Sequence, residues 1–101
     1  MKETRIIVCD DEKSEREELI RDIKEVWKDP LVEEAQSGRE VLWKLEKDRN
    51  YDFIFLDIYM DEMDGIETGR RIHEEYPEIR LVFVSNSREF GPEAFALNAV
   101  H

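Results

Sequence analysis

Four short apolar runs, separated by longer amphipathic stretches, constrain the fold of this chain more than any other feature. The runs cover residues 6–9, 31–35, 53–56 and 81–84. They are rich in β-branched and aromatic residues and are too short for helices, so we predict four strands. Strands that alternate with helices form a parallel sheet with right-handed crossovers and helices on both faces. The pattern therefore predicts an α/β fold.

The stretches between the runs carry the signals of helices. Two capping boxes, in which a serine is followed along the first helical turn by a glutamate, each begin a predicted helix. They are Ser14 with Glu17 and Ser37 with Glu40. The other two helices are predicted over residues 66–75 and from residue 91 onward, where a proline suits a first turn. The predicted order of elements is β-α-β-α-β-α-β-α.

The chemistry of the strands predicts their order in the sheet. The first, third and fourth runs are apolar at every position, as expected for strands covered on both faces. The second run contains adjacent charges and fits an edge. A flavodoxin-like, doubly wound sheet with strand order 2-1-3-4 agrees with both observations. Because the fourth run has the character of an interior strand, we expect residues 1–101 to form one domain truncated before a fifth strand and helix, with the fourth strand's edge exposed.

Charge and composition exclude several classes of function. The 101 residues include 26 Asp and Glu against 15 Lys and Arg, a formal net charge of −11. Nucleic acids and anionic membranes are bound through Lys and Arg, so we expect this segment to bind neither. The apolar runs are too short to cross a membrane or to form a secretory signal. The single cysteine, Cys9, is expected to be a buried hydrophobic residue in a cytoplasmic protein.

Acidic residues directly follow two strands that this order makes neighbours. Asp10 and Asp11 follow the first strand, and Asp57 follows the third. In open α/β sheets, ligands bind beyond the carboxyl ends of the strands where the winding direction reverses, which here is between these two strands. Carboxylates on strands about 4.8 Å apart can share one ion. With oxygen donors alone, the expected ion is Mg²⁺ or Mn²⁺.

Each of these acids, taken alone, is also explained as a helix cap or a solvated loop residue. Their combination at two adjoining strand ends favours a functional site. Ser85 ends the fourth strand, beside the third, and adds a hydroxyl donor to the same pocket. We therefore predict one site formed by residues of three strand ends.

The segments around these residues resemble a known family. They are Ile7–Glu12, Phe55–Met60, Met63–Gly65 and Phe83–Ser85. Together they are similar to the receiver domain of two-component response regulators, and the resemblance covers essentially the whole chain. It implies a signalling domain rather than an enzyme, with a sensor histidine kinase or a small phosphodonor as the source of a phosphoryl group.

The resemblance also implies a role for each residue of the site. Asp57 matches the aspartate that attacks phosphorus as a carboxylate nucleophile and becomes an acyl phosphate. Asp11 and Asp57 match direct ligands of Mg²⁺, Asp10 binds it directly or through water, and the backbone carbonyl of Tyr59 completes the protein ligands. Ser85 matches the switch hydroxyl that moves toward the phosphoryl oxygens. The cation neutralises the equatorial oxygens of a loose transition state.

Two further segments, residues 57–67 and 93–99, resemble the LytTR branch of the family. In that branch the receiver is followed by a β-rich DNA-binding domain that regulates transcription, and we expect no effector domain within residues 1–101. The phosphate-binding lysine of the family ends a fifth strand, which we expect beyond His101. Asp61 stands where most receivers have proline. A homodimer through the fourth helix or the exposed edge of the fourth strand is a further expectation.

Other functions remain as alternatives. A receiver-like interaction module that no longer takes phosphate would act only through the fourth helix and the edge of the fourth strand. The intact acids at positions 10, 11 and 57, with Ser85, favour the phosphoacceptor. A metal-dependent phosphatase is disfavoured because Tyr59 stands where such hydrolases have a second carboxylate, and a nucleotide-binding fold lacks its glycine-rich loop.

Overall fold

The computed structural model describes residues 3–60, 65–84 and 97–99. In chain order the elements are β1 (Arg5–Cys9), α1 (Lys13–Val26), β2 (Leu31–Ala35), α2 (Gly38–Lys47), β3 (Phe53–Asp57), α3 (Gly65–Glu75), β4 (Arg80–Val84) and β5 (Leu97–Ala99). Within these ranges, no helix has both the length and the apolar character that a membrane span requires.

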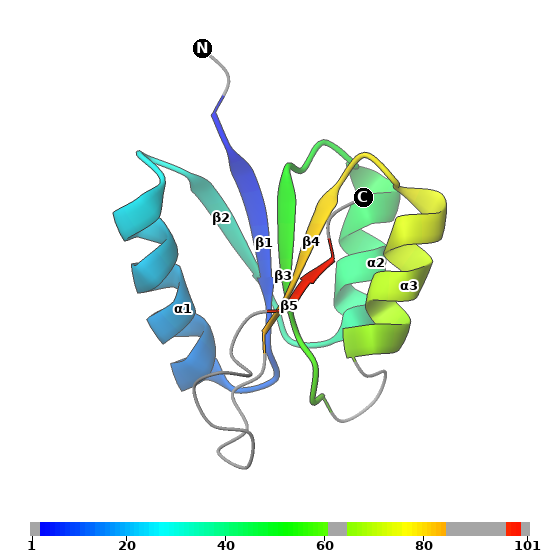
Figure 1. Cartoon of the computed structure of the whole chain (residues 1–101), viewed down its shortest axis with the longest axis horizontal. Coiled ribbons are helices and arrows are strands. Elements are labelled where there is room, and N and C mark those ends of the chain that lie inside the picture. Colours follow the sequence, from blue (N-terminus) through cyan, green and yellow to red (C-terminus); the bar gives the residue numbers. More distant parts are fainter. Residues whose placement is uncertain (1–2, 61–64, 85–96, 100–101) are drawn as a thin grey trace.

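The elements form one sheet with helices on both faces. The strand order is β2-β1-β3-β4-β5, and the first four strands pair in parallel. In Figure 1, α1 covers one face of the sheet, and α2 and α3 cover the other. The predicted α/β fold and its order 2-1-3-4 are therefore confirmed. The charged strand β2 pairs with β1 and lies at the edge, as predicted.

The edge of β4 differs from the prediction. Residues 97–99 form β5, which pairs antiparallel with residues 81–83 of β4. The prediction of an exposed edge is therefore wrong, and so is the prediction that the fourth helix extends through these residues. A strand edge presents unpaired N–H and C=O groups, and an antiparallel segment satisfies them without the crossover helix that a parallel strand needs. The predicted start of that helix, at residue 91, lies outside the described residues.

The two predicted capping boxes have different outcomes. At α2 the prediction is confirmed, because the Glu40 N–H donates to Ser37 Oγ over 3.1 Å. At α1 it is wrong, because the helix begins at Lys13, ahead of Ser14. Here the N–H of Glu12, the residue before the helix, donates to Asp10 Oδ1 over 2.9 Å. That hydrogen bond turns the chain into the helix before the serine is reached.

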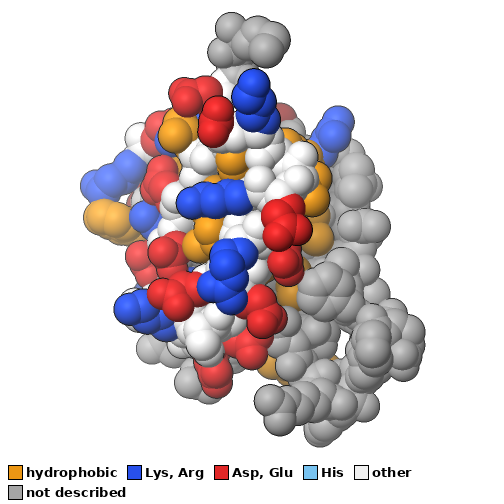
Figure 2. All heavy atoms as spheres, turned by 90° about the vertical axis from the view of Figure 1, so that its left-hand side faces the viewer, with side chains coloured by type: hydrophobic (Ala, Val, Ile, Leu, Met, Phe, Trp, Pro, Cys, Tyr) orange, Lys and Arg blue, Asp and Glu red, His pale blue; other side chains and the backbone are white. Residues whose placement is uncertain are grey.

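Apolar residues of the interior strands pack on both faces of the sheet. Ile7 and Ile54 contribute to the cluster that includes residues of α2 and α3, and Ile6 and Val8 to the cluster that includes residues of α1. Successive side chains of a strand point to opposite faces, so strands covered on both sides are apolar throughout. On the side of the molecule that carries α1, charged side chains of both signs are spread among white and hydrophobic areas of the described surface (Figure 2). The sheet is thus a fixed platform for the residues that follow its strands.

Candidate functional site

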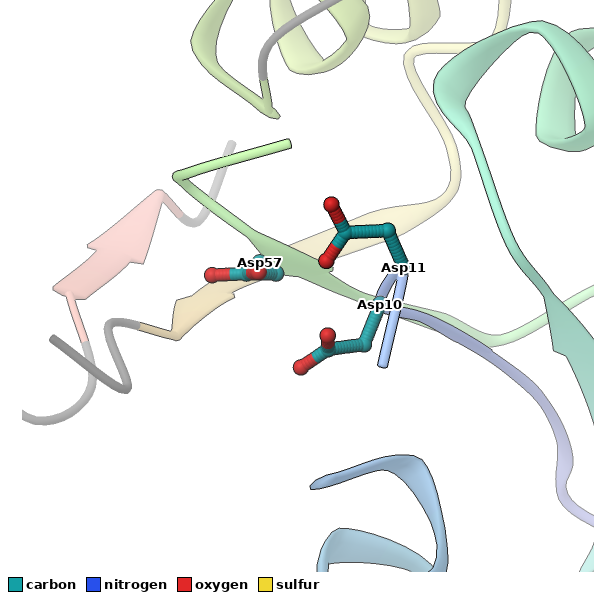
Figure 3. Close-up of side chains that lie close together, drawn as sticks. All are labelled: Asp10, Asp11 and Asp57. Atoms are coloured by element: carbon teal, nitrogen blue, oxygen red, sulfur yellow. The ribbon is translucent and has the colours of Figure 1, made fainter. Parts of the chain in front are cut away.

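Three acidic residues gather at the carboxyl ends of β1 and β3. The register pairs Cys9 with Leu56, so the residues that follow, Asp10 and Asp57, stand at equivalent heights on neighbouring strands. Asp10, Asp11 and Asp57 each offer a carboxylate oxygen within 4.8 Å of the others. Figure 3 shows the three side chains grouped at the carboxyl ends of the two strands. The structure therefore brings together the three acids that the sequence predicted to converge.

The environment of Asp57 disfavours its charged form. Burial, followed by the charge of Asp10, raises the pKa of the Asp57 carboxyl to about 7 from its ordinary value of 3.8. The N–H of Tyr59, 3.2 Å from Asp57 Oδ1, opposes this rise by donating a hydrogen bond. The charges of Asp11 and Glu15 add to the rise. A bound divalent cation would reverse this balance by favouring the charged carboxylates.

The donors of this cluster suit a hard cation. Every side-chain donor in it is a carboxylate oxygen, which is the ligand type of Mg²⁺. Asp10 and Asp57 are 2% and 7% exposed, whereas Asp11 is exposed. A cation there would have two buried ligands and one at the solvent side.

The segment after Asp57 is held by its backbone. The Ile58 N–H donates to the Val84 carbonyl over 2.9 Å, and the Gly65 N–H donates to the Ile58 carbonyl over 3.1 Å. Tyr59 is half-exposed at the rim of the site, and its carbonyl as a metal ligand stays a prediction. Ser85 follows Val84 but lies outside the described residues, so its role also stays a prediction.

Gly65 begins α3 in close contact with the backbone of Asp57. A Cβ at this position would overlap the backbone carbonyl of Asp57. We expect Gly65→Ala to destabilise the fold by about 1–3 kcal/mol, because the overlap forces backbone shifts even though alanine favours a helix. Urea unfolding measures this change. The control, Glu75→Ala on the exposed end of α3, should stay within about 0.5 kcal/mol of the original; equal stability of both variants would show that the close approach is not required.

Cys9 is the last residue of β1 and directly precedes Asp10. It is buried, as predicted, with 1% of its surface exposed. Burial, followed by the charge of Asp10, raises the pKa of its thiol to about 12. Its Sγ lies 3.4 Å from the sulfur of Met60, which follows Asp57 on the neighbouring segment. The protonated thiol therefore packs as a hydrophobic group.

Comparison with known proteins agrees with this geometry. The model of the response regulator receiver domain family matches residues 6–100. The chain belongs to this family. Among curated relatives, the receiver domain is 31% identical over 96 residues to the sensory transduction protein LytT of Oceanobacillus iheyensis, covering 93% of this chain and 39% of that protein. It is also 31% identical over 93 residues to the transcriptional regulatory protein LytR of Staphylococcus aureus, covering 92% and 37%.

Solved structures show the same receiver fold. The response regulator TrrA of Thermotoga maritima, crystallised in complex with Mg²⁺ and BeF, is 28% identical, with a TM-score of 0.75. The match covers 87% of this chain and 74% of that one. A two-component transcriptional regulator AraC of Clostridium phytofermentans is 28% identical with a TM-score of 0.72, covering 85% and 69%. The receiver domain spans less than two fifths of the curated LytT and LytR proteins.

One residue next to the site was not predicted from the sequence. Arg16, on α1, is buried, and its Nη1 donates to the backbone carbonyl of Asp10 over 2.8 Å. The spacing of Arg16 in the sequence could have indicated its burial. It precedes Leu19, Ile20 and Ile23 at the intervals typical of the buried face of a helix. A charged residue within an apolar stripe must find buried partners.

Proposed function

We propose that this receiver domain is a phosphoacceptor in which Asp57 takes a phosphoryl group with Mg²⁺ held by Asp10, Asp11 and Asp57. The observation that carries the proposal is the convergence of these three carboxylates within 4.8 Å at the ends of β1 and β3. Repulsion among them favours uptake of a divalent cation. The family match to receiver domains supports the same site.

Each residue of the site has a chemical task. A carboxylate oxygen of Asp57 attacks phosphorus, the bond from phosphorus to the donor breaks, and the donor leaves with the electron pair, so an acyl phosphate forms. Bound Mg²⁺ would neutralise the charge of the phosphoryl oxygens. The Tyr59 N–H, which donates to Asp57 Oδ1, orients the nucleophile. We assign the Tyr59 carbonyl as a further metal ligand.

Ser85 is proposed as the switch hydroxyl. It directly follows Val84, whose carbonyl accepts a hydrogen bond from Ile58, the residue next to Asp57. A phosphoryl group on Asp57 adds strong hydrogen-bond acceptors close to the end of β4. Donation by the Ser85 hydroxyl would stabilise a new placement of the segment after β4.

The partner and output follow from the same proposal. We assign a sensor histidine kinase as the phosphodonor, with small phosphodonors as substitutes. We assign to the receiver domain a cytoplasmic location and a signalling role without turnover of a substrate. The relatives LytT and LytR carry the names of a sensory transduction protein and a transcriptional regulatory protein. We propose transcription as the output, through an effector domain and with a phosphate-binding lysine that both lie outside residues 1–101.

Phosphate incorporation tests the assignment. The full-length protein, with the effector domain and lysine proposed to lie outside residues 1–101, is incubated with acetyl phosphate and Mg²⁺, and its intact mass is measured. We expect the mass of one phosphoryl group to be added to the original protein and to the control Asp22→Asn, which changes an exposed acid on α1. We expect none on Asp57→Asn or when EDTA removes the metal. If the original protein gains no phosphate, or Asp57→Asn gains as much, the phosphoacceptor assignment fails and the interaction module becomes the better hypothesis.

A further inference from the structure

Arg16 is a buried cation beside the acidic cluster. Its side chain is 7% exposed, and its guanidinium donates in two directions. Nε donates to Glu34 Oε1 at the end of β2 over 2.8 Å, and Nη1 donates to the Asp10 carbonyl, also over 2.8 Å. Arg16 therefore joins α1, the turn after β1 and the edge strand β2. None of the tasks assigned above to the site uses it.

The contact with Arg16 completes the hydrogen bonding of the Asp10 backbone. The Asp10 N–H donates to the Ala35 carbonyl over 3.1 Å, and the Asp10 carboxylate accepts from the Glu12 N–H over 2.9 Å. The remaining polar group, the Asp10 carbonyl, accepts from Arg16. With its N–H, carbonyl and carboxylate all hydrogen-bonded, Asp10 has a fixed orientation.

We propose that Arg16 is a positioning residue that keeps the carboxylates of Asp10 and Asp11 directed at Asp57. The proposal rests on the metal-dependent phosphoacceptor function above. Three carboxylates within 4.8 Å of one another repel when no cation is present. The side chain of Glu12 does not cap α1, so two hydrogen bonds hold the turn that carries Asp10 and Asp11 against this repulsion. One runs from the Glu12 N–H to Asp10 Oδ1, and the other from Arg16 to the Asp10 carbonyl.

Arginine suits this task better than lysine. The planar guanidinium carries several N–H donors in a fixed fork, so one side chain reaches the Asp10 carbonyl and Glu34 at once. An ammonium group on a flexible stem does not fix both directions. Glu34 also offsets the charge of Arg16, so the cation adds little repulsion toward a metal ion.

The test is the affinity for Mg²⁺ alone, measured by titration while the amide resonances of Asp11 and Ile58 are followed by NMR. We expect Arg16→Lys and Arg16→Met to raise the Kd about tenfold, as loss of a residue that orients a metal ligand does. Glu34→Gln, which keeps the acceptor, should raise it less. The matched control Arg21→Lys, at an exposed position of the same helix, should leave the Kd unchanged. Urea unfolding of each variant separates loss of affinity from loss of fold.

The outcomes separate this inference from the proposed function. If the original protein binds Mg²⁺ and takes phosphate while Arg16→Lys binds Mg²⁺ within threefold of it, Arg16 has no positioning role. If the original protein binds no Mg²⁺, both proposals are wrong. Should Arg16→Met fail to fold, Arg16→Lys decides the question, because it retains the charge and most of the buried stem.

Discussion

Mg²⁺ binding by the receiver domain is expected to weaken about 100-fold when the pH falls from 8 to 5, because a carboxylate ligand must lose its proton to bind. The pKa of Asp57 is about 7 without metal. Each pH unit below that value reduces the ionised fraction, and with it the apparent affinity, about tenfold. A carboxylate with its ordinary pKa of 3.8 would stay ionised over most of this range. Mg²⁺ titrations at several pH values, followed by amide chemical shifts, measure the effect.

Asp57→Asn supplies the control for this pH dependence. The amide does not titrate over this range, so the part of the pH dependence that comes from Asp57 should be absent from the weaker binding that remains. Phosphorylation of the original protein by acetyl phosphate at a fixed, low Mg²⁺ concentration should decline in parallel with the affinity. A Kd that changes less than threefold in the original protein would show that Asp57 is not protonated at pH 5.

The sheet and the acidic cluster could be predicted because they depend on local patterns. Apolar runs without charged interruptions indicate strands covered on both faces, and the residues that follow neighbouring parallel strands meet at one edge. Asp10 and Asp57 follow directly from that rule. Their convergence could be predicted without knowledge of any side-chain contact, because the strand order places both carboxylates beside the same switch point.

The features that could not be predicted depend on pairing between distant residues. Residues 93–99 include good helix formers, yet residues 97–99 form β5, since hydrogen bonds to the edge of β4 outweigh a weak local preference. Ser14 has the spacing of a capping residue, but the Asp10 carboxylate fixes the turn before it. Arg16 has the spacing of a core residue, and its partners come from the end of β2 and the turn after β1.

Replacing Asp57 by asparagine is expected to stabilise the metal-free protein at pH 8 by up to about 4 kcal/mol. This is the free energy that corresponds to a rise in pKa from 3.8 to about 7. The folded state holds the proton more tightly than the unfolded state does. The destabilisation of the original protein by the charged Asp57 carboxylate is therefore absent below about pH 4. It grows as the pH rises through the range between the two pKa values and is complete above about pH 7.

Urea unfolding in EDTA at pH 4 and pH 8 tests this, because acids away from the cluster titrate alike in both proteins, and their contributions cancel when Asp57→Asn is compared with the original. A large advantage of the variant at pH 8 and none at pH 4 is the expected result. An equal advantage at both values would trace the effect to the shape of the amide and not to charge. Mg²⁺ should remove the advantage at pH 8, because a cation bound among the carboxylates offsets both the burial of the Asp57 charge and its repulsion by Asp10, which destabilise the metal-free protein. The buried, mutually repelling charges that weaken the fold would then be the source of the site's affinity for metal.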